Sequence, residues 1–175
     1  VTSTGQKIRT VDITVTAAMA ALVFLGTYIF KIPTISGYVH LGDCMILLTV
    51  ALFGMKKGAI AGAIGGGLSD FIGGYFYWVV PTLLIKCMWA IVMGLIMHKV
   101  LKDKKGSFLI GAIAGGVLHI IAYTLVRVVL YGGKTAIIEI PALAFQTGAG
   151  IVIGFVIYML LKKSGVAGRL SGMVK

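Results

Sequence analysis

Residues 107–131, SFLIGAIAGGVLHIIAYTLVRVVLY, form the stretch of the chain that decides its fold class. Arg127 is the one formally charged residue in this run. A helix needs about 20 predominantly apolar residues to cross a hydrocarbon core roughly 30 Å thick. The run meets that requirement, so it predicts a transmembrane helix.

Comparable apolar runs occupy most of the remaining sequence. Charged residues make up 12% of the 175 residues, against about 25% in ordinary soluble domains, and the mean hydropathy is +1.04. We therefore predict an all-α integral membrane protein, a single bundle of six transmembrane helices that forms one domain over residues 1–175. The spans are expected near residues 11–30, 39–55, 58–75, 82–98, 107–131 and 139–161.

The second of these runs is short, and Asp43 interrupts its start. A re-entrant hairpin made of the second and third runs is therefore an alternative, and it would place Lys56 and Lys57 at a tip inside the bilayer. A charge at the centre of a spanning helix costs roughly 2.5–3.5 kcal/mol on insertion scales. Two full spans avoid this cost and are the preferred interpretation.

The positive charges predict the orientation. The chain carries a net charge of +11, and most of its cations fall in short clusters on one predicted side of the membrane. These cations are Lys7, Arg9, Lys56, Lys57, Lys99, Lys102, Lys104, Lys105, Lys162, Lys163, Arg169 and Lys175. The positive-inside rule then places both termini in the cytoplasm. Clusters between apolar runs are a topology pattern, so we expect no nucleic-acid partner.

Small residues recur every four positions inside the spans. Gly54, Gly58, Gly62 and Gly66 are one such series, and close approach at small residues is what packs membrane helices together. A further pair, Ala17 and Ala21, lies near the cytoplasmic end of the first span. From spacing alone, this pair serves either the chain's own bundle or a partner helix.

Ionisable side chains gather at one predicted depth. Asp43, Asp70, Lys86, Arg127 and Glu139 all fall in the outer parts of their spans, and charges inside a membrane usually face the bundle interior or a wet cavity. This convergence predicts one cavity open to the outside. The predicted substrate-binding residues are Tyr38, His40, Asp43, Tyr75, Trp78, Lys86, Arg127, Tyr131, Glu139 and Gln146.

Two features of this set have more than one interpretation. Its aromatic side chains suit a planar ligand, although Tyr and Trp also form interfacial belts in membrane proteins. Asp70 and Lys86 are predicted to form a structural ion pair, because unpaired buried charges are so unfavourable. Since acids and bases nearly balance, we expect a neutral or zwitterionic ligand.

No catalytic motif is present in the sequence. It lacks HExxH, GxSxG and a P-loop, so we expect neither enzymatic activity nor ATP hydrolysis by this chain. Cys44 and Cys87 have no metal-ligand spacing and are read as buried small hydrophobic residues. We expect no cofactor and no metal site.

Four motifs, in order, resemble the substrate-binding S components of energy-coupling factor (ECF) vitamin transporters. They are GYVHLGD at 37–43, FGMKKGAIAGAIGGGLSD at 53–70, GGY at 73–75 and PTLLIK at 81–86. The similarity extends over nearly the whole chain in length, topology and motif order. Within this family, the chain looks most like the group that handles hydroxymethylpyrimidine or pyridoxine-like vitamins.

The resemblance implies a function that composition and spacing do not show. S components bind a vitamin from outside and join one transmembrane coupling protein and two cytoplasmic ATPases, here in a bacterial cell membrane. The family's docking surface on the first helix maps to Ala17 and Ala21. The first outer loop, around residues 35–40, would act as a lid, and the subunit would reorient to release its ligand inward.

Two other functional classes remain open at this stage. A small membrane enzyme acting on a lipid or prenyl substrate needs acid–base partners, and the cytoplasmic side offers Asp103 and His98 among lysines. A channel or scaffold subunit would conduct or assemble without saturable ligand binding.

Overall fold

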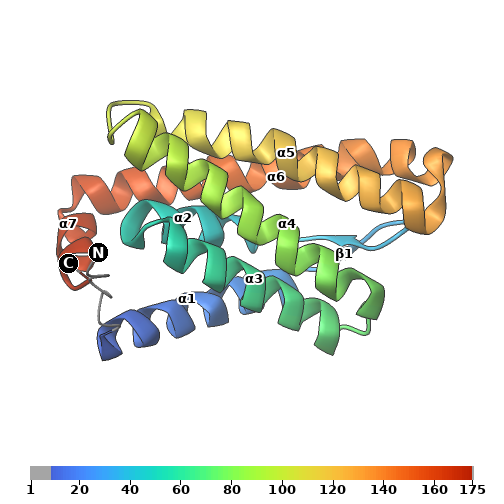
Figure 1. Ribbon diagram of the computed structural model, residues 1–175, viewed down its shortest axis with the longest axis horizontal. Helices are drawn as coiled ribbons and strands as arrows, with labels where there is room; N and C mark the ends of the chain where they lie inside the picture. Colours follow the sequence, from blue (N-terminus) through green and yellow to red (C-terminus); the bar gives the residue numbers. More distant parts are fainter. Residues whose placement is uncertain (1–8, 175) are drawn as a thin grey trace, which may run out of the picture.

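The computed structural model describes residues 9–174, so Lys7 and Lys175, both predicted to be cytoplasmic, lie outside the described residues. The helices run side by side along one long axis (Figure 1). The elements are α1 (Thr10–Tyr28), β1 (Ile32–Pro33), β2 (Tyr38–Val39), α2 (Asp43–Phe53), α3 (Met55–Ile72), α4 (Phe76–Gly94), η1 (Leu95–Val100), α5 (Ser107–Tyr131), α6 (Gly133–Lys163) and α7 (Val166–Gly172).

Within residues 9–174, four helical segments are long and apolar enough to cross a membrane: α1, α4 together with the π-helical η1, α5 and α6. The chain is thus a multi-pass membrane protein. The bounds of α5 match the predicted 107–131. Helix α6 begins at Gly133, six residues before the predicted 139, because Gly132, with φ 84°, ends α5 and the next helix starts immediately.

The predicted second span, 39–55, differs most from the structure. Helix α2 has 11 residues, Asp43–Phe53, and at 1.5 Å per residue it is only about 16 Å long. Residues 39–42 instead belong to β2 and the loop that follows it. The short antiparallel pair of β1 and β2, with Ile32 opposite Val39, lies toward the end of the bundle away from α7 (Figure 1).

The link between α2 and α3 lies at the other end of the bundle. Lys57 pairs with Asp12 in the first turn of α1 over 3.0 Å. Arg9 Nη2 donates to the carbonyl oxygen of Met173, just after α7, over 2.7 Å. The link between α2 and α3 therefore lies level with the start of α1 and with α7. In the re-entrant alternative, this link would be the tip of the hairpin and would lie halfway along the bundle. The segment that joins η1 to α5 reaches the same end (Figure 1).

Glycines let the helix backbones approach closely. Gly58 of the predicted four-residue series packs against Val50 of α2, and glycines outside that series also make close approaches. A methyl group on Gly65 of α3 would come within 2.5 Å of the carbonyl oxygen of Ala20 in α1. One on Gly150 of α6 would lie 2.9 Å from Asp43 Cβ at the start of α2. These approaches bring α1, α2, α3 and α6 near enough for short polar side chains to meet between them.

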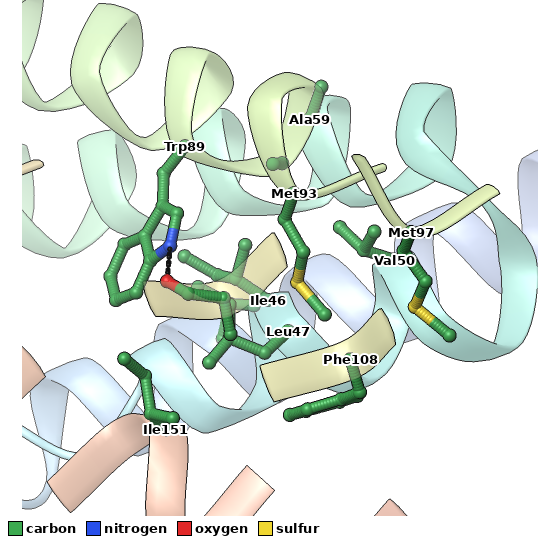
Figure 2. Close-up of a cluster of buried hydrophobic side chains, with 12 residues drawn as sticks. Ile46, Leu47, Val50, Ala59, Trp89, Met93, Met97, Phe108 and Ile151 are labelled. Atoms are coloured by element: carbon green, nitrogen blue, oxygen red, sulfur yellow. Dashed lines mark hydrogen bonds between the residues drawn. The ribbon is translucent and has the colours of Figure 1, made fainter. Parts of the chain in front are cut away.

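A hydrophobic core of buried side chains packs between the helices (Figure 2). Met93, Met97 and Phe108 belong to it, together with Val50 of α2. Trp89 closes this core on one side, and its indole N–H donates to the carbonyl oxygen of Ala112 over 3.1 Å (Figure 2). The imidazole of His119 packs against the same indole, with ring centroids 4.3 Å apart. Beyond Trp89, buried polar side chains such as Lys86 and His119 lie beside a second, smaller apolar cluster that contains Trp78, Ile85, Tyr123 and Leu143.

Candidate ligand-binding site

Three helices each present a stripe of side chains at a spacing of three or four residues, which places them on one helix face. Trp78, Thr82 and Lys86 form the stripe of α4, and His119, Tyr123 and Arg127 that of α5. Glu139, Leu143, Gln146 and Thr147 form the stripe of α6. All ten residues are buried. The stripes meet near Asp43, the first residue of α2. At this level they enclose a chamber lined by polar and aromatic side chains.

Helices α4 and α5 are joined along these stripes. Tyr123 donates its hydroxyl to Thr82 Oγ1 over 2.9 Å. The ring of Trp78 stacks on that of Tyr123 at 5.6 Å, and the guanidinium of Arg127 lies 5.2 Å from the centroid of the Trp78 ring. Two aromatic faces and one cation therefore form a single wall.

A buried ion pair lies at the floor of the chamber. Lys86 and Asp43 bind each other, and each is at most 1% exposed. Gln146 Nε2 donates to the second carboxylate oxygen of Asp43 over 2.7 Å, and Lys86 Nζ lies 3.0 Å from His119 Nε2. A buried ion pair is tolerated when further hydrogen bonds satisfy its remaining polar atoms, and Gln146 and His119 provide them.

The hairpin of β1 and β2 closes the chamber from the opposite side. In its turn, the backbone N–H of Ser36 donates to Glu139 Oε1 over 2.8 Å. Tyr38 donates its hydroxyl to Asp70 of α3. Lys31, just before β1, donates to the carbonyl oxygen of Ser69 over 3.3 Å. The hairpin is thus fastened to α3 on one side and to α6 on the other.

A small cavity lies between the hairpin and the three stripes. Five of the ten predicted substrate-binding residues line it: Tyr38, His40, Trp78, Arg127 and Gln146. Thr27, Gly37, Asp70, Thr82, Tyr123 and Leu143 complete the lining. The cavity holds about 30 Å³ of free space, far below the roughly 300–1,000 Å³ of common ligand pockets. The cavity in this conformation is therefore too small for a ligand of common size.

The other five predicted residues stand behind the lining. Asp43 holds Gln146, Lys86 holds Asp43 and Glu139 holds the hairpin. Tyr131 accepts the indole N–H of Trp78 over 3.0 Å, and the ring of Tyr75 packs on that of Tyr38 at 4.8 Å. These residues support the wall of the cavity rather than form its surface.

The predicted ion pair between Asp70 and Lys86 is wrong. Lys86 pairs with Asp43, while Asp70 accepts the hydroxyl of Tyr38 and lines the cavity. The prediction placed Asp43 near the outer end of a full span over residues 39–55. Because α2 starts deep in the bundle, its first residue reaches the level of Lys86.

Sequence reasoning overlooked several polar residues of the site. His119 was not among the predicted site residues, yet it contacts Lys86 and places Nδ1 3.0 Å from Thr147 Oγ1. Thr82, Thr147 and Ser36 were not singled out. The four-residue spacing of His119, Tyr123 and Arg127 was the available signal, because it places His119 on the face that carries the predicted ligand residues.

Burial controls the titration of the hairpin and loop side chains. It lowers the pKa of His40 to about 4, with Lys86 and Lys31 acting in the same direction and Asp43 against them. Burial, together with the negative charge of Asp70, raises the pKa of Tyr38 well above its usual range. Both side chains are therefore neutral at physiological pH. Within residues 9–174, no group of three or more His, Cys, Asp or Glu side chains is placed to share a metal ion.

Comparison with known families shows to which family the chain belongs. Residues 7–163 match the family model described as "ECF-type riboflavin transporter, S component", which covers most of the chain. The chain belongs to this family of S components. As an S component, it is a substrate-binding subunit of a vitamin transporter, and its family is one of transport proteins rather than enzymes.

A second comparison gives a relative of this S component. A protein from Pyrococcus woesei, described as an uncharacterized protein in a gap 3' region, is 36% identical to it over 132 residues. The matched part covers 75% of this S component and 87% of the relative. The family match confirms the resemblance to ECF S components, while the hydroxymethylpyrimidine or pyridoxine type stays a prediction.

Proposed function

We propose that this S component captures one uncharged, planar vitamin in the cavity beneath the β1–β2 hairpin. The observation that supports this most directly is the meeting of buried polar and aromatic side chains from α4, α5 and α6 around one small cavity. Both buried cations near it face an acid, Lys86 facing Asp43 and Arg127 facing Glu139 at 3.9 Å, while the buried Asp70 accepts the hydroxyl of Tyr38. Such a site favours a neutral ligand over a phosphate ester. The negative charges of a phosphate would have no free cation to pair with in the low-dielectric interior of the described part of the chain.

Two vitamin types fit this proposal. The family description names riboflavin, and the sequence motifs resemble those of the hydroxymethylpyrimidine and pyridoxine group. All three ligands contain an aromatic ring that suits the wall of Trp78 and Tyr123. A tricyclic flavin needs a larger displacement of the hairpin than a single ring does, because the enclosed space is so small.

We further propose that the chain crosses the membrane six times, with both termini in the cytoplasm. The cationic segments at 56–57, 99–105 and 162–169 lie at the α7 end of the bundle (Figure 1), as the positive-inside rule requires of a cytoplasmic face. The cavity then opens to the outside. Delivery would follow when the subunit reorients on a transmembrane coupling protein driven by two ATPases, and the exposed Ala17 and Ala21 of α1 suit that contact. A bacterial source stays a prediction.

Titration of the purified chain tests the proposal. The chain alone, in detergent and without ATP, is titrated calorimetrically with riboflavin, pyridoxine and hydroxymethylpyrimidine, and with riboflavin 5'-phosphate as the charged control. We expect one of the three neutral vitamins to bind at micromolar concentration or below, and the phosphate ester at least tenfold more weakly. Absence of binding to all three, in protein that unfolds cooperatively, contradicts the proposal.

A further inference from the structure

The amide of Gln146 has a fixed orientation in the cavity wall. A carboxylate only accepts hydrogen bonds, so the atom that lies 2.7 Å from Asp43 Oδ2 must be the nitrogen of the Gln146 amide. The same amide nitrogen lies 3.4 Å from His40 Nε2. Asp43 thus determines which polar atom of Gln146 faces His40.

The imidazole of His40 is constrained from its other side. The backbone N–H of Gly42 donates to His40 Nδ1 over 3.1 Å, so a neutral ring carries its proton on Nε2. This N–H then faces the amide nitrogen of Gln146, which is also a donor. In the opposite tautomer, Gly42 would lose its acceptor instead. Either way, one buried N–H group has no acceptor among the described residues.

Arg127 presents another unused donor to the same cavity. Its Nε donates to Ser36 Oγ over 3.2 Å, and its Nη2 lies 3.9 Å from Glu139 Oε2. Its Nη1 is buried and has no hydrogen-bond partner among residues 9–174, although the whole side chain is only 5% exposed. Buried donors in native proteins almost always have an acceptor, so this one points to a ligand.

We infer that the cavity recognises a ligand edge with at least two acceptor atoms. One acceptor, a ring nitrogen or carbonyl oxygen, takes the N–H groups of His40 and Gln146, and a second takes Arg127 Nη1. The ring plane lies against Trp78 and Tyr123. The substrate class is an uncharged aromatic heterocycle with acceptors along one edge, a chemistry that flavins, pyridines and pyrimidines share. This inference rests on the proposed function and specifies which side chains read the ligand.

Two variants remove the donors while each keeps one neighbouring contact, although Arg127→Lys also loses the Nε donor to Ser36 Oγ. In His40→Asn, the side-chain oxygen can still accept the N–H of Gly42, but the donor at the Nε2 position is lost. In Arg127→Lys, a cation stays beside Glu139, but Nη1 is lost. Thr49→Val is the matched control, because Thr49 is fully buried in α2, bonds only its own helix at the Met45 carbonyl and does not line the cavity.

The variants are titrated with parent vitamins and with analogues that lack one acceptor. Riboflavin is paired with 5-deazariboflavin and 1-deazariboflavin, and pyridoxine with its benzene analogue. We expect each donor variant to bind the parent vitamin about tenfold to a hundredfold more weakly, as the loss of a buried hydrogen bond predicts. The variant whose donor meets the missing acceptor should also lose the wild type's preference for the parent over that analogue. Thr49→Val should behave as the wild type.

The outcomes separate the two proposals. If both donor variants bind the parent vitamin within twofold of the wild type, the inference is overturned while vitamin capture stands. If the wild type binds none of the vitamins, the proposed function fails and the inference fails with it. Thermal unfolding in detergent identifies any variant that does not fold, and the other variant then decides.

Discussion

The backbone N–H of Ser36 donates to Glu139 Oε1 over 2.8 Å, and this bond ties the turn of the β1–β2 hairpin to α6. The two residues are 103 positions apart in sequence. Arg127 reaches the same turn through the hydroxyl of Ser36. The charged residues of α5 and α6 therefore hold the hairpin over the cavity, in addition to any contact that Arg127 makes with a ligand.

The first prediction concerns this fastening. Glu139→Leu removes the acceptor for Ser36 and leaves Arg127 without its buried counter-ion. A hydrogen bond to a charged group contributes about 1.5–3 kcal/mol, so ligand dissociation should be roughly tenfold to a hundredfold faster. Stopped-flow displacement of bound vitamin measures the rate. Glu139→Gln keeps an acceptor for Ser36 and should show the smaller increase. Equal rates in both variants would mean that the hairpin does not retain the ligand.

A second prediction tests the ion pair at the floor. Lys86→Met leaves the carboxylate of Asp43 buried without its cation, and breaking a buried pair costs about 3–5 kcal/mol. We expect a marked fall in the midpoint of thermal unfolding in detergent. The double variant Lys86→Met with Asp43→Asn should recover much of the loss, because no unpaired charge remains. A single variant as stable as the wild type would show that the pair contributes little.

Sequence patterns predicted the fold well where several signals agreed. The run 107–131 gave a helix with the expected bounds because hydropathy, length and the glycine at each end agree. Residues 39–55 carried conflicting signals, because an apolar run is interrupted by Asp43 near its start and contains Gly42 and Gly54. The structure resolves this conflict with an 11-residue helix, since close packing of α2 against α6 at Gly150 lets Asp43 be buried.

The sequence predicted which residues belong to the site better than it predicted which charged residues pair with each other. The depth argument brought together the residues that line the cavity or support it, because a buried charge has to face other polar groups. Which partner each charge takes depends on where α2 begins, and no local pattern encodes that position. Lys86 was therefore assigned to Asp70, although Asp43 binds it. The contribution of the backbone N–H of Ser36 could not be predicted from the residue type, because every residue except proline has this donor.

A third prediction follows from the neutral state of His40. Burial holds its pKa at about 4, whereas an unfolded chain protonates histidine near pH 6.5. The folded form thus binds the proton less readily, so the stabilising contribution is full above pH 6.5 and falls as the pH drops toward 4. The loss is at most about 1.4 kcal/mol per pH unit. The midpoint of thermal unfolding of the wild type should fall more steeply with decreasing pH in this window than that of His40→Asn. Parallel profiles would contradict this account.

The last prediction addresses the outer face of α1. Ala17 and Ala21 are exposed, while Ala20 of the same helix is buried against α3. A small-residue surface allows a partner helix to approach closely, so Ala21→Trp should lower vitamin uptake at least tenfold in cells that express the coupling module. Vitamin binding by the purified variant should stay within twofold of the wild type, because Ala21 does not line the cavity. Leu22→Trp is the control, since Leu22 is 44% exposed and points about 140° away from Ala17 around the helix. If both variants reduce uptake equally, bulk anywhere on α1 impairs transport and the docking surface is not specific to the two alanines.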